Sequence, residues 1–364
     1  MMKTYALGEL FSGAGGLALG AVRAAPEKTT ARIRHAWATD LDADACATYR
    51  QNICHGNDGS VLCGDVRQLD LRPENPFFRS HPFNAFAFGF PCNDFSTIGK
   101  QKGFSGTYGP LYTYGVRVLR AFRPEWFLAE NVSGLRSANG REALPKILMD
   151  FSRAGYRVYP HLYAFEQYGI PQARHRIIIV GIRDDLPQIF RPPAPTTPDP
   201  SSWRTAREAL EDPPIPQDAA NHEMPHMSPV VQERLHFIRP GENAFTANLP
   251  PKLRLHVRGA RISQIYRRLD PDRPAYTVTG SGGGGTHIYH YKEDRSLTNR
   301  ERARLQTFPD SYVFLGTRES VRRQIGMAVP CEGARQIFTA ILNTMEGIPY
   351  WSVPCNIQPP EPVS

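Results

Sequence analysis

The stretch Glu9–Gly20, ELFSGAGGLALG, decides the fold of this 364-residue chain. It overlaps the apolar run Tyr5–Leu10, which predicts a β-strand, and it leads into a predicted helix from about Gly15 to Ala24. Closely spaced glycines between a strand and a helix allow a tight turn and the approach of a ligand to the start of the helix. The spacing is not GxGxxG, which argues against a dinucleotide site. A simple tight turn is the alternative interpretation.

Short apolar strands and helical stretches alternate up to about residue 183. This alternation predicts a doubly wound α/β sheet, in which ligands bind at the carboxyl ends of the strands. Further strands are expected at 35–38, 61–63, 85–88, 126–129, 158–163 and 177–181, and further helices at 43–52, 111–122 and 142–153.

The composition changes after Arg183. Residues 184–251 are rich in proline, which predicts an irregular domain with few helices. Residues 276–291, YTVTGSGGGGTHIYHY, are expected to form two β-rich runs around a glycine loop. A helical pattern returns at Leu297, and residues 330–344 are expected to dock back on the first domain. We therefore predict a large domain of residues 1–183 and 297–350, a smaller irregular domain of 184–296 and a C-terminal tail of 351–364.

The composition also limits the class of protein. A net charge of +8 favours polyanions as partners, although charge alone is a weak argument. No apolar run approaches the roughly 20 residues that a membrane span needs, and the N-terminus lacks a signal pattern. The six cysteines show neither a CxxC pair nor zinc-ligand spacing. We expect reduced thiols, no metal site, no membrane partner and a cytoplasmic location.

Two aspartates follow predicted strands in the first domain. Asp40 ends the second strand, where a carboxylate can accept hydrogen bonds from ribose hydroxyls. Asp65 follows the third strand and is placed to contact an adenine amino group. An ordinary turn or N-cap residue is the alternative for each.

The segment Gly89–Ser96, GFPCNDFS, places a cysteine after the strand at 85–88. Cys92 can act as a nucleophile there if nearby groups lower the pKa of its thiol. A buried structural thiol is the alternative. Lys100 and Lys102 make the following loop basic, as either a flap that closes on a polyanion or a solvated loop would be.

Two further motifs supply a carboxylate and a pair of arginines. Glu130, in AENV, ends an apolar strand and can donate a proton or hydrogen bond to a ring nitrogen, although a turn acid is the alternative. Arg174 and Arg176 precede the strand at 177–181 and alternate, so both side chains are expected to leave one face. Two such arginines suit a phosphate or a base carbonyl.

These motifs, in this order, resemble the DNA cytosine-5 methyltransferase family of bacterial type. So do residues 267–279 (RRLDPDRPAYTVT), 297–312 (LTNRERARLQTFPDSY) and 324–330 (QIGMAVP). The resemblance covers residues 7–330 apart from the variable stretch 184–266. It implies a Rossmann-like S-adenosylmethionine-dependent catalytic domain, with 184–296 as a target-recognition domain. It further implies double-stranded DNA as substrate, a monomer, a nucleoid-associated location and pairing with a restriction endonuclease as an option.

The resemblance also implies roles for individual residues. Cys92 would attack C6 of a cytosine flipped out of the duplex, and Glu130 would interact with N3. Arg174 and Arg176 would contact the cytosine carbonyl and hold the loop or backbone. The cofactor contacts implied are Phe11, Gly13, Ala14, Gly15, Asp40, Asp65, Pro91 and Leu111.

Three residues depart from the family pattern. Asn93 stands where glutamine is usual after Pro-Cys, Asp40 replaces the usual glutamate, and Met327 replaces an asparagine. None is the proposed nucleophile or acid, so we expect activity.

The most informative stretch for base recognition is the glycine loop. Gly280–Gly285 is expected to approach the bases closely, with Arg267, Arg268, Thr279 and Thr286 nearby. A flexible hairpin turn is the alternative.

Two other functions remain open. One branch of the family methylates transfer RNA, and an inactive DNA-binding regulator would share the fold. The sizeable recognition segment favours DNA, and the presence of Cys92 and Glu130 argues against an inactive protein.

Overall fold

The computed structural model describes residues 3–54, 58–90, 111–255, 263–282 and 285–359, with the side chains of residues 58, 139 and 140 excepted. The chain divides into two compact units. The first unit comprises Met1–Ala164, His175–Ala194 and Cys331–Ser364, and the second comprises Phe165–Arg174 and Pro195–Pro330.

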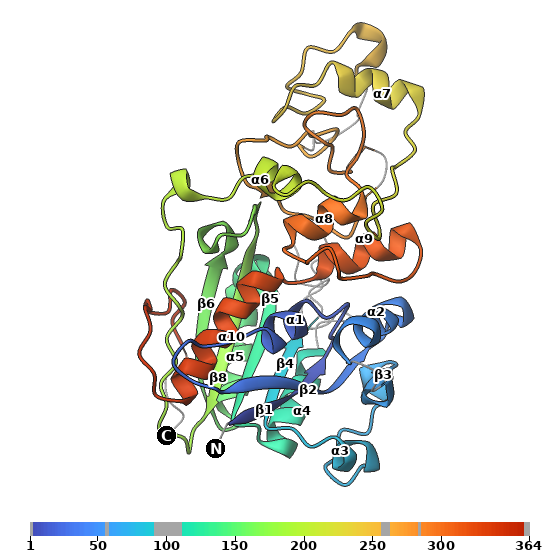
Figure 1. Cartoon of the computed structure of the whole chain (residues 1–364). Helices are drawn as coiled ribbons and strands as arrows, with labels where there is room; N and C mark the ends of the chain where they lie inside the picture. Colours follow the sequence, from blue (N-terminus) through green and yellow to red (C-terminus); the bar gives the residue numbers. More distant parts are fainter. Residues whose placement is uncertain (1–2, 55–57, 91–110, 256–262, 283–284, 360–364) are drawn as a thin grey trace. The chain divides into compact units, whose positions relative to one another are not determined.

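A seven-stranded sheet forms the centre of the first unit, in the order β3-β2-β1-β4-β5-β8-β6 (Figure 1). The first five of these strands run parallel, whereas β8 is antiparallel to both β5 and β6. The strands are β1 (Thr4–Leu10), β2 (Arg32–Asp40), β3 (Val61–Cys63), β4 (Ala85–Gly89), β5 (Trp126–Val132), β6 (Tyr156–Ala164) and β8 (His175–Arg183). The strand order reverses direction between β1 and β4, which is where ligands of such sheets bind.

The helices of the first unit join segments that are far apart in sequence. Helix α10, red in Figure 1, packs against α1, blue, although some 300 residues separate them. The C-terminal stretch also belongs to this unit, because the Trp351 carbonyl accepts a hydrogen bond from the Ala194 amide. The helices are α1 (Gly16–Val22), α2 (Ala43–Ile53), α3 (Pro76–Ser80), α4 (Tyr112–Phe122), α5 (Ala143–Ser152) and α10 (Cys331–Met345).

Aromatic side chains dominate the core of the first unit. Trp37 and Phe127 are fully buried, and each contacts several other rings. Phe86 and Phe88 stack with their ring centroids 5.0 Å apart. Large buried rings remove much apolar surface from water, which holds the strand ends in fixed positions.

The second unit has little sheet and short helices. Its only named strands among the described residues, β7 (Gln172–Ala173) and β9 (Ala275–Tyr276), form a two-stranded parallel sheet. The Thr298 hydroxyl and the Glu301 carboxylate form a capping box at the start of α8, which fixes where that helix begins. The helices are α6 (Ala206–Glu211), α7 (Pro229–His236), α8 (Asn299–Leu305) and α9 (Arg318–Met327).

The predicted α/β fold is confirmed, and each predicted strand and helix of residues 5–183 is present within a few residues of its expected bounds. Helix α10 packs on the first unit as expected. The prediction of two β-rich runs at 276–291 is wrong for the described residues of this stretch. They contain only the end of β9 and two isolated β-bridges at Tyr289. Tyr289 of this stretch packs in a small buried hydrophobic cluster rather than in a sheet.

The boundaries of the compact units differ from the predicted domains. Residues 297–330 lie in the second unit rather than with the sheet, and residues 165–174 join them there. The assignment of catalysis to residues 1–183 and 297–350, and of target recognition to 184–296, stays a prediction.

The described ranges contain no helix that is long and apolar enough to cross a membrane. They also contain no group of three or more histidine, cysteine or acidic side chains that could hold a metal ion.

Candidate active site

The glycine turn after β1 is tied to the end of β2. Gly13 and Gly15 have φ values of +54° and +87°, which residues with a Cβ rarely adopt. The Gly13 amide donates to Asp40 Oδ2 at 2.8 Å, and the Asp42 amide donates to Asp40 Oδ1 at 2.9 Å. A carboxylate oxygen has two acceptor sites, so each Asp40 oxygen keeps capacity for another donor. Burial raises the pKa of Asp40.

The turn leaves room for a ligand. A Cβ placed on Gly13 would have no described atom within 4 Å. Phe11, also at positive φ, begins the turn, and the side chain of Ala14 is buried within it. The open space beside Gly13 and the acceptor capacity of Asp40 fit an adenosyl group, and a hydrogen bond from its ribose to Asp40 stays a prediction.

Asp65 adopts the ordinary role of a turn aspartate. It caps the 3-10 helix Val66–Gln68, and its carboxylate forms an ion pair with Arg67. These hydrogen bonds from Arg67 lower the pKa of Asp65. A contact between Asp65 and an adenine amino group stays a prediction.

Glu130 and Arg176 form an ion pair across two neighbouring strands. Glu130 lies in β5 opposite Ile178 of β8, and Arg176 lies opposite Val132. Arg176 Nε is 2.9 Å from Glu130 Oε1, and both side chains are only 13% exposed. Gly89 pairs with Glu130 at the end of β4, and a Cβ there would lie 3.1 Å from Glu130 Oε2. The carboxylate therefore has a fixed orientation at the carboxyl end of β4 and β5.

Asn131 connects this pair to the segment that carries the cysteine motif. Its side-chain amide donates to the Phe90 carbonyl at 3.1 Å, and the side chain is 1% exposed. Pro91 and Cys92 follow Phe90 directly but lie outside the described residues, as do Asn93, Lys100 and Lys102. Leu111 is buried and lies just before α4.

Arg174 does not share a face with Arg176. Its side chain is 1% exposed, and its guanidinium donates to the carbonyls of Val278, Gly326 and Ala328 at 2.9, 3.0 and 2.9 Å. These three acceptors belong to the second unit, whereas Glu130, the ion-pair partner of Arg176, belongs to the first. The expected shared face is therefore wrong, because the chain passes from one unit to the other between the two residues.

Comparison with known proteins decides the family. The family model for C-5 cytosine-specific DNA methylase matches residues 5–343. The chain is 55% identical over 353 residues to the type II methyltransferase M.BbvI of Brevibacillus brevis, covering 95% of this chain and 93% of the relative.

This chain belongs to the C-5 cytosine-specific DNA methylase family.

Other relatives agree with this placement. The chain is 41% identical to the type II methyltransferase M.NgoFVII of Neisseria gonorrhoeae, covering 92% of this chain and 85% of the relative. A solved Escherichia coli structure, described as a prophage-encoded DNA modification methyltransferase, aligns with a TM-score of 0.71 at 23% identity. It covers 94% of this chain and 99% of that one, and at this identity it supports the fold alone. Relatives of this methylase thus include enzymes of restriction-modification type.

Two buried polar residues of the methylase were missed from the sequence. Asn131 is one of them. An asparagine inside an apolar strand is the sequence feature that could have indicated a buried hydrogen-bonding role. Glu9 is the other: its side chain is 1% exposed and accepts a hydrogen bond from Tyr49 at 2.5 Å. Tyr49 in turn lies 3.0 Å from His35 Nδ1. Burial raises the pKa of Glu9 to about 7 and lowers that of His35 to about 4.

The residues expected beside the glycine loop have different surroundings. Arg268 is buried and donates to the carbonyls of Leu235 and His290 and to Asp294, so it has structural partners in this unit, and a place near the bases stays a prediction. Arg267 lies over the Tyr276 ring at 4.6 Å. Thr279 and Thr286 are exposed. Residues 283 and 284 lie outside the described residues.

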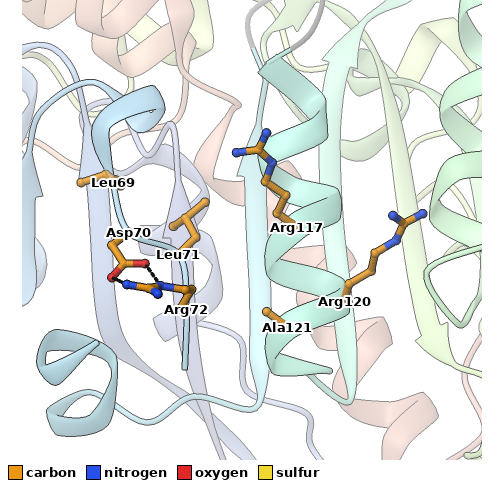
Figure 2. Close-up of a pocket in the computed structure, with 7 residues that line it drawn as sticks. All are labelled: Leu69, Asp70, Leu71, Arg72, Arg117, Arg120 and Ala121. Carbon is orange, nitrogen blue, oxygen red and sulfur yellow. Dashed lines mark hydrogen bonds and ion pairs between the residues drawn. The ribbon is translucent and has the colours of Figure 1, made fainter. Parts of the chain in front are cut away.

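A surface hollow of about 490 Å³ lies elsewhere in the first unit, beside α4 (Figure 2). Asp70 and Arg72, which line it, form an ion pair of 2.6 Å on its edge. None of the predicted site residues contributes to its described lining, so it is separate from the site at the strand ends.

Proposed function

We propose that this methylase transfers a methyl group to C5 of a cytosine flipped out of duplex DNA, with Cys92 as the nucleophile. The observation that supports this most is the oriented Glu130–Arg176 pair, joined through Asn131 to the carbonyl two residues before Cys92. Flipping is needed because C6 of a stacked base is out of reach of an enzyme side chain.

The chemistry accounts for the residue types. Cytosine C5 is a poor nucleophile until C6 carries an adduct. The Cys92 thiolate forms a bond to C6, and Glu130 in its carboxylic acid form gives its proton to N3, so that the electron pair of the ring enamine becomes available at C5; N3 returns this proton to Glu130 when Cys92 leaves. Arg176 keeps the Glu130 carboxyl in place and donates to the cytosine carbonyl. After methylation, C5 loses its proton, the C5–C6 double bond re-forms and Cys92 leaves.

Bound S-adenosylmethionine would supply an electrophilic methyl group on its sulfonium. We infer that Asp40 accepts hydrogen bonds from its ribose and that Gly13 and Gly15 provide backbone space beside it. The remaining contacts that we propose are Phe11, Ala14, Asp65, Pro91 and Leu111.

Arg174 has a positioning role in this proposal. Its guanidinium donates hydrogen bonds to three backbone carbonyls in the second unit, which supports the expectation that one of the two arginines holds the backbone. We therefore assign the contact with the cytosine carbonyl to Arg176.

We infer that residues 184–296 read the DNA sequence, since base edges are read by the part that enters a groove. We further propose a monomer that acts on chromosomal DNA in the cytoplasm, paired with a restriction endonuclease of the same specificity.

Bisulfite sequencing of DNA from a host that expresses the methylase tests this function. We expect one cytosine within one short DNA motif to be methylated and so to resist conversion by bisulfite. With the Cys92→Ser variant, no cytosine should resist conversion. Sequencing of transfer RNA from the same cells tests the rival substrate. Protection in transfer RNA but not in DNA would contradict the proposal, and protection in neither would indicate an inactive regulator.

A further inference from the structure

Both ends of the glycine loop are fixed within the second unit. Before the loop, the Val278 amide donates to Gln172 Oε1 at 2.8 Å, and Arg174 donates to the Val278 carbonyl at 2.9 Å. After the loop, the Gly285 carbonyl accepts a hydrogen bond from the Tyr266 amide at 2.7 Å. A Cβ on Gly285 would lie 2.7 Å from the Tyr266 ring, so the backbone and the ring are in close contact.

The loop also crosses helix α9 with no side chain between the two backbones. A Cβ on Gly326 of α9 would overlap the backbone nitrogen of Gly280. A Cβ on Gly280 would lie 3.0 Å from the carbonyl oxygen of Arg323 and 3.1 Å from its Cα. Glycine at these two positions therefore permits a backbone approach that a larger residue at either one would disturb.

Arg322 of α9 extends this contact along the loop. Its Nη2 donates to the Gly282 carbonyl at 3.2 Å and also lies 3.4 Å from the exposed carboxylate of Glu319. The Arg322 side chain is only 16% exposed, so its bond to the loop is shielded from water. Gly282 is also close to His287, because a Cβ on Gly282 would lie 2.9 Å from His287 Nδ1. An imidazole and a guanidinium thus limit the position of the Gly282 backbone.

Exposed hydroxyl groups lie between these fixed points. The side chains of Thr279 and Ser281 are exposed, whereas Val278 and Gly285 are buried. The Thr279 hydroxyl donates to the Ser281 carbonyl at 3.1 Å, which braces the backbone within the loop. A hydroxyl can donate to or accept from a base edge, so an exposed serine on a fixed backbone suits direct reading of bases.

We propose that Arg322 is a positioning residue for DNA recognition, which sets the backbone of the glycine loop at Gly282 before DNA binds. The inference rests on the reading of DNA by residues 184–296 proposed above. A loop that is already ordered loses less conformational entropy on binding. Contacts with base edges require one backbone position, whereas contacts with phosphates carry no sequence information. Arg322 therefore affects cognate DNA more than unrelated DNA.

Arg322→Met tests this role, with Arg318→Met as the matched control. Arg318 begins α9, and its guanidinium lies 3.5 Å from the Met224 carbonyl, so the control removes the same charge from the same helix at a different contact. Arg322→Met should bind the motif found by bisulfite sequencing about tenfold more weakly, because the loop loses a charge-assisted hydrogen bond. Its affinity for an unrelated duplex should change no more than that of Arg318→Met.

Two further variants separate the bond to the loop from the charge. Gly280→Ala keeps the charge but places a Cβ against the backbone of α9, so it should also weaken cognate binding more than unrelated binding. Arg322→Lys keeps a donor for the Gly282 carbonyl and should recover part of the affinity that Arg322→Met loses. The melting temperature of each variant shows that it is folded.

Hydrogen exchange in the full chain without DNA supplies the second readout. In Arg322→Met, the peptide that contains Ser281 and Gly282 should exchange faster than in the wild type and in Arg318→Met, because local opening becomes easier. Unchanged exchange or unchanged cognate affinity would overturn the positioning role. Equal losses of cognate and unrelated affinity would also overturn it, because they indicate a phosphate contact.

Exchange in the free protein is measured without DNA, and wild-type methylation is measured without the variants. Failure of the positioning role and failure of the proposed function are therefore distinguishable.

Discussion

Arg176 Nε lies 2.9 Å from Glu130 Oε1, and the two side chains are equally shielded from water, at 13% exposed each. The pair joins the last parallel strand of the sheet to its antiparallel neighbour. A half-buried carboxylate that already has a fixed direction can act on a ring nitrogen without reorganising when the base arrives.

Glu130→Gln should lower kcat by about 10²–10⁴-fold, the usual contribution of a positioned acid–base group, and should change cofactor affinity little. Steady-state kinetics and cofactor titration measure the two quantities. Glu125→Gln is the matched control, because Glu125 forms a surface ion pair with Lys3 in the same unit. A loss below threefold in Glu130→Gln would make Glu130 a structural residue.

Asn131→Ala should slow formation of the covalent adduct at least tenfold, because the Phe90 carbonyl loses the donor that positions the start of the cysteine segment. The free energy of unfolding should fall by about 1–3 kcal/mol, the cost of a buried group left unsatisfied. Single-turnover trapping and urea unfolding separate the two effects. An unchanged trapping rate in a destabilised protein would reduce Asn131 to a packing residue.

The comparison of Arg174 with Arg176 shows what the sequence could predict. Apolar strands bounded by glycine and charged residues located the sheet. Asp40 ends β2 as predicted, whereas Glu130 lies two residues before the end of β5. The partners of Arg174 are 104, 152 and 154 residues away, and no local pattern contains them. Alternation predicts a shared face only where the strand continues, and β8 begins at His175, after Arg174.

Arg174→Met should destabilise the second unit by roughly 3 kcal/mol or more, because three buried carbonyls lose their donors. Arg174→Lys should recover only part of this, since one ammonium cannot reproduce the fork of a guanidinium. Denaturant unfolding measures both. Arg176→Met is the comparison and should lower activity more than stability; equal stability of the two methionine variants would contradict the positioning role of Arg174.

Glu9→Gln should change how stability depends on pH. The pKa of Glu9 rises from an ordinary value of 4.5 to about 7 in the folded protein because of burial. The unfolded chain therefore loses its proton first, and the wild-type free energy of unfolding falls as pH rises between these values and then levels off.

The glutamine variant lacks this titration, so its stability relative to wild type should increase by up to roughly 3 kcal/mol from pH 4.5 to 8. Urea unfolding at several pH values measures the difference. A difference that stays constant with pH would show that Glu9 ionises at the same pH in both states.

The most direct test of the account is covalent capture by Cys92. A duplex with 5-fluorocytosine at the target position, incubated with the methylase and S-adenosylmethionine, should give an adduct that survives a denaturing gel, because fluorine cannot leave C5 as the proton does. Cys92→Ser, which should still bind DNA and cofactor, should give none. A wild-type protein that methylates ordinary DNA but forms no adduct, or a serine variant that forms the same adduct, would contradict the mechanism.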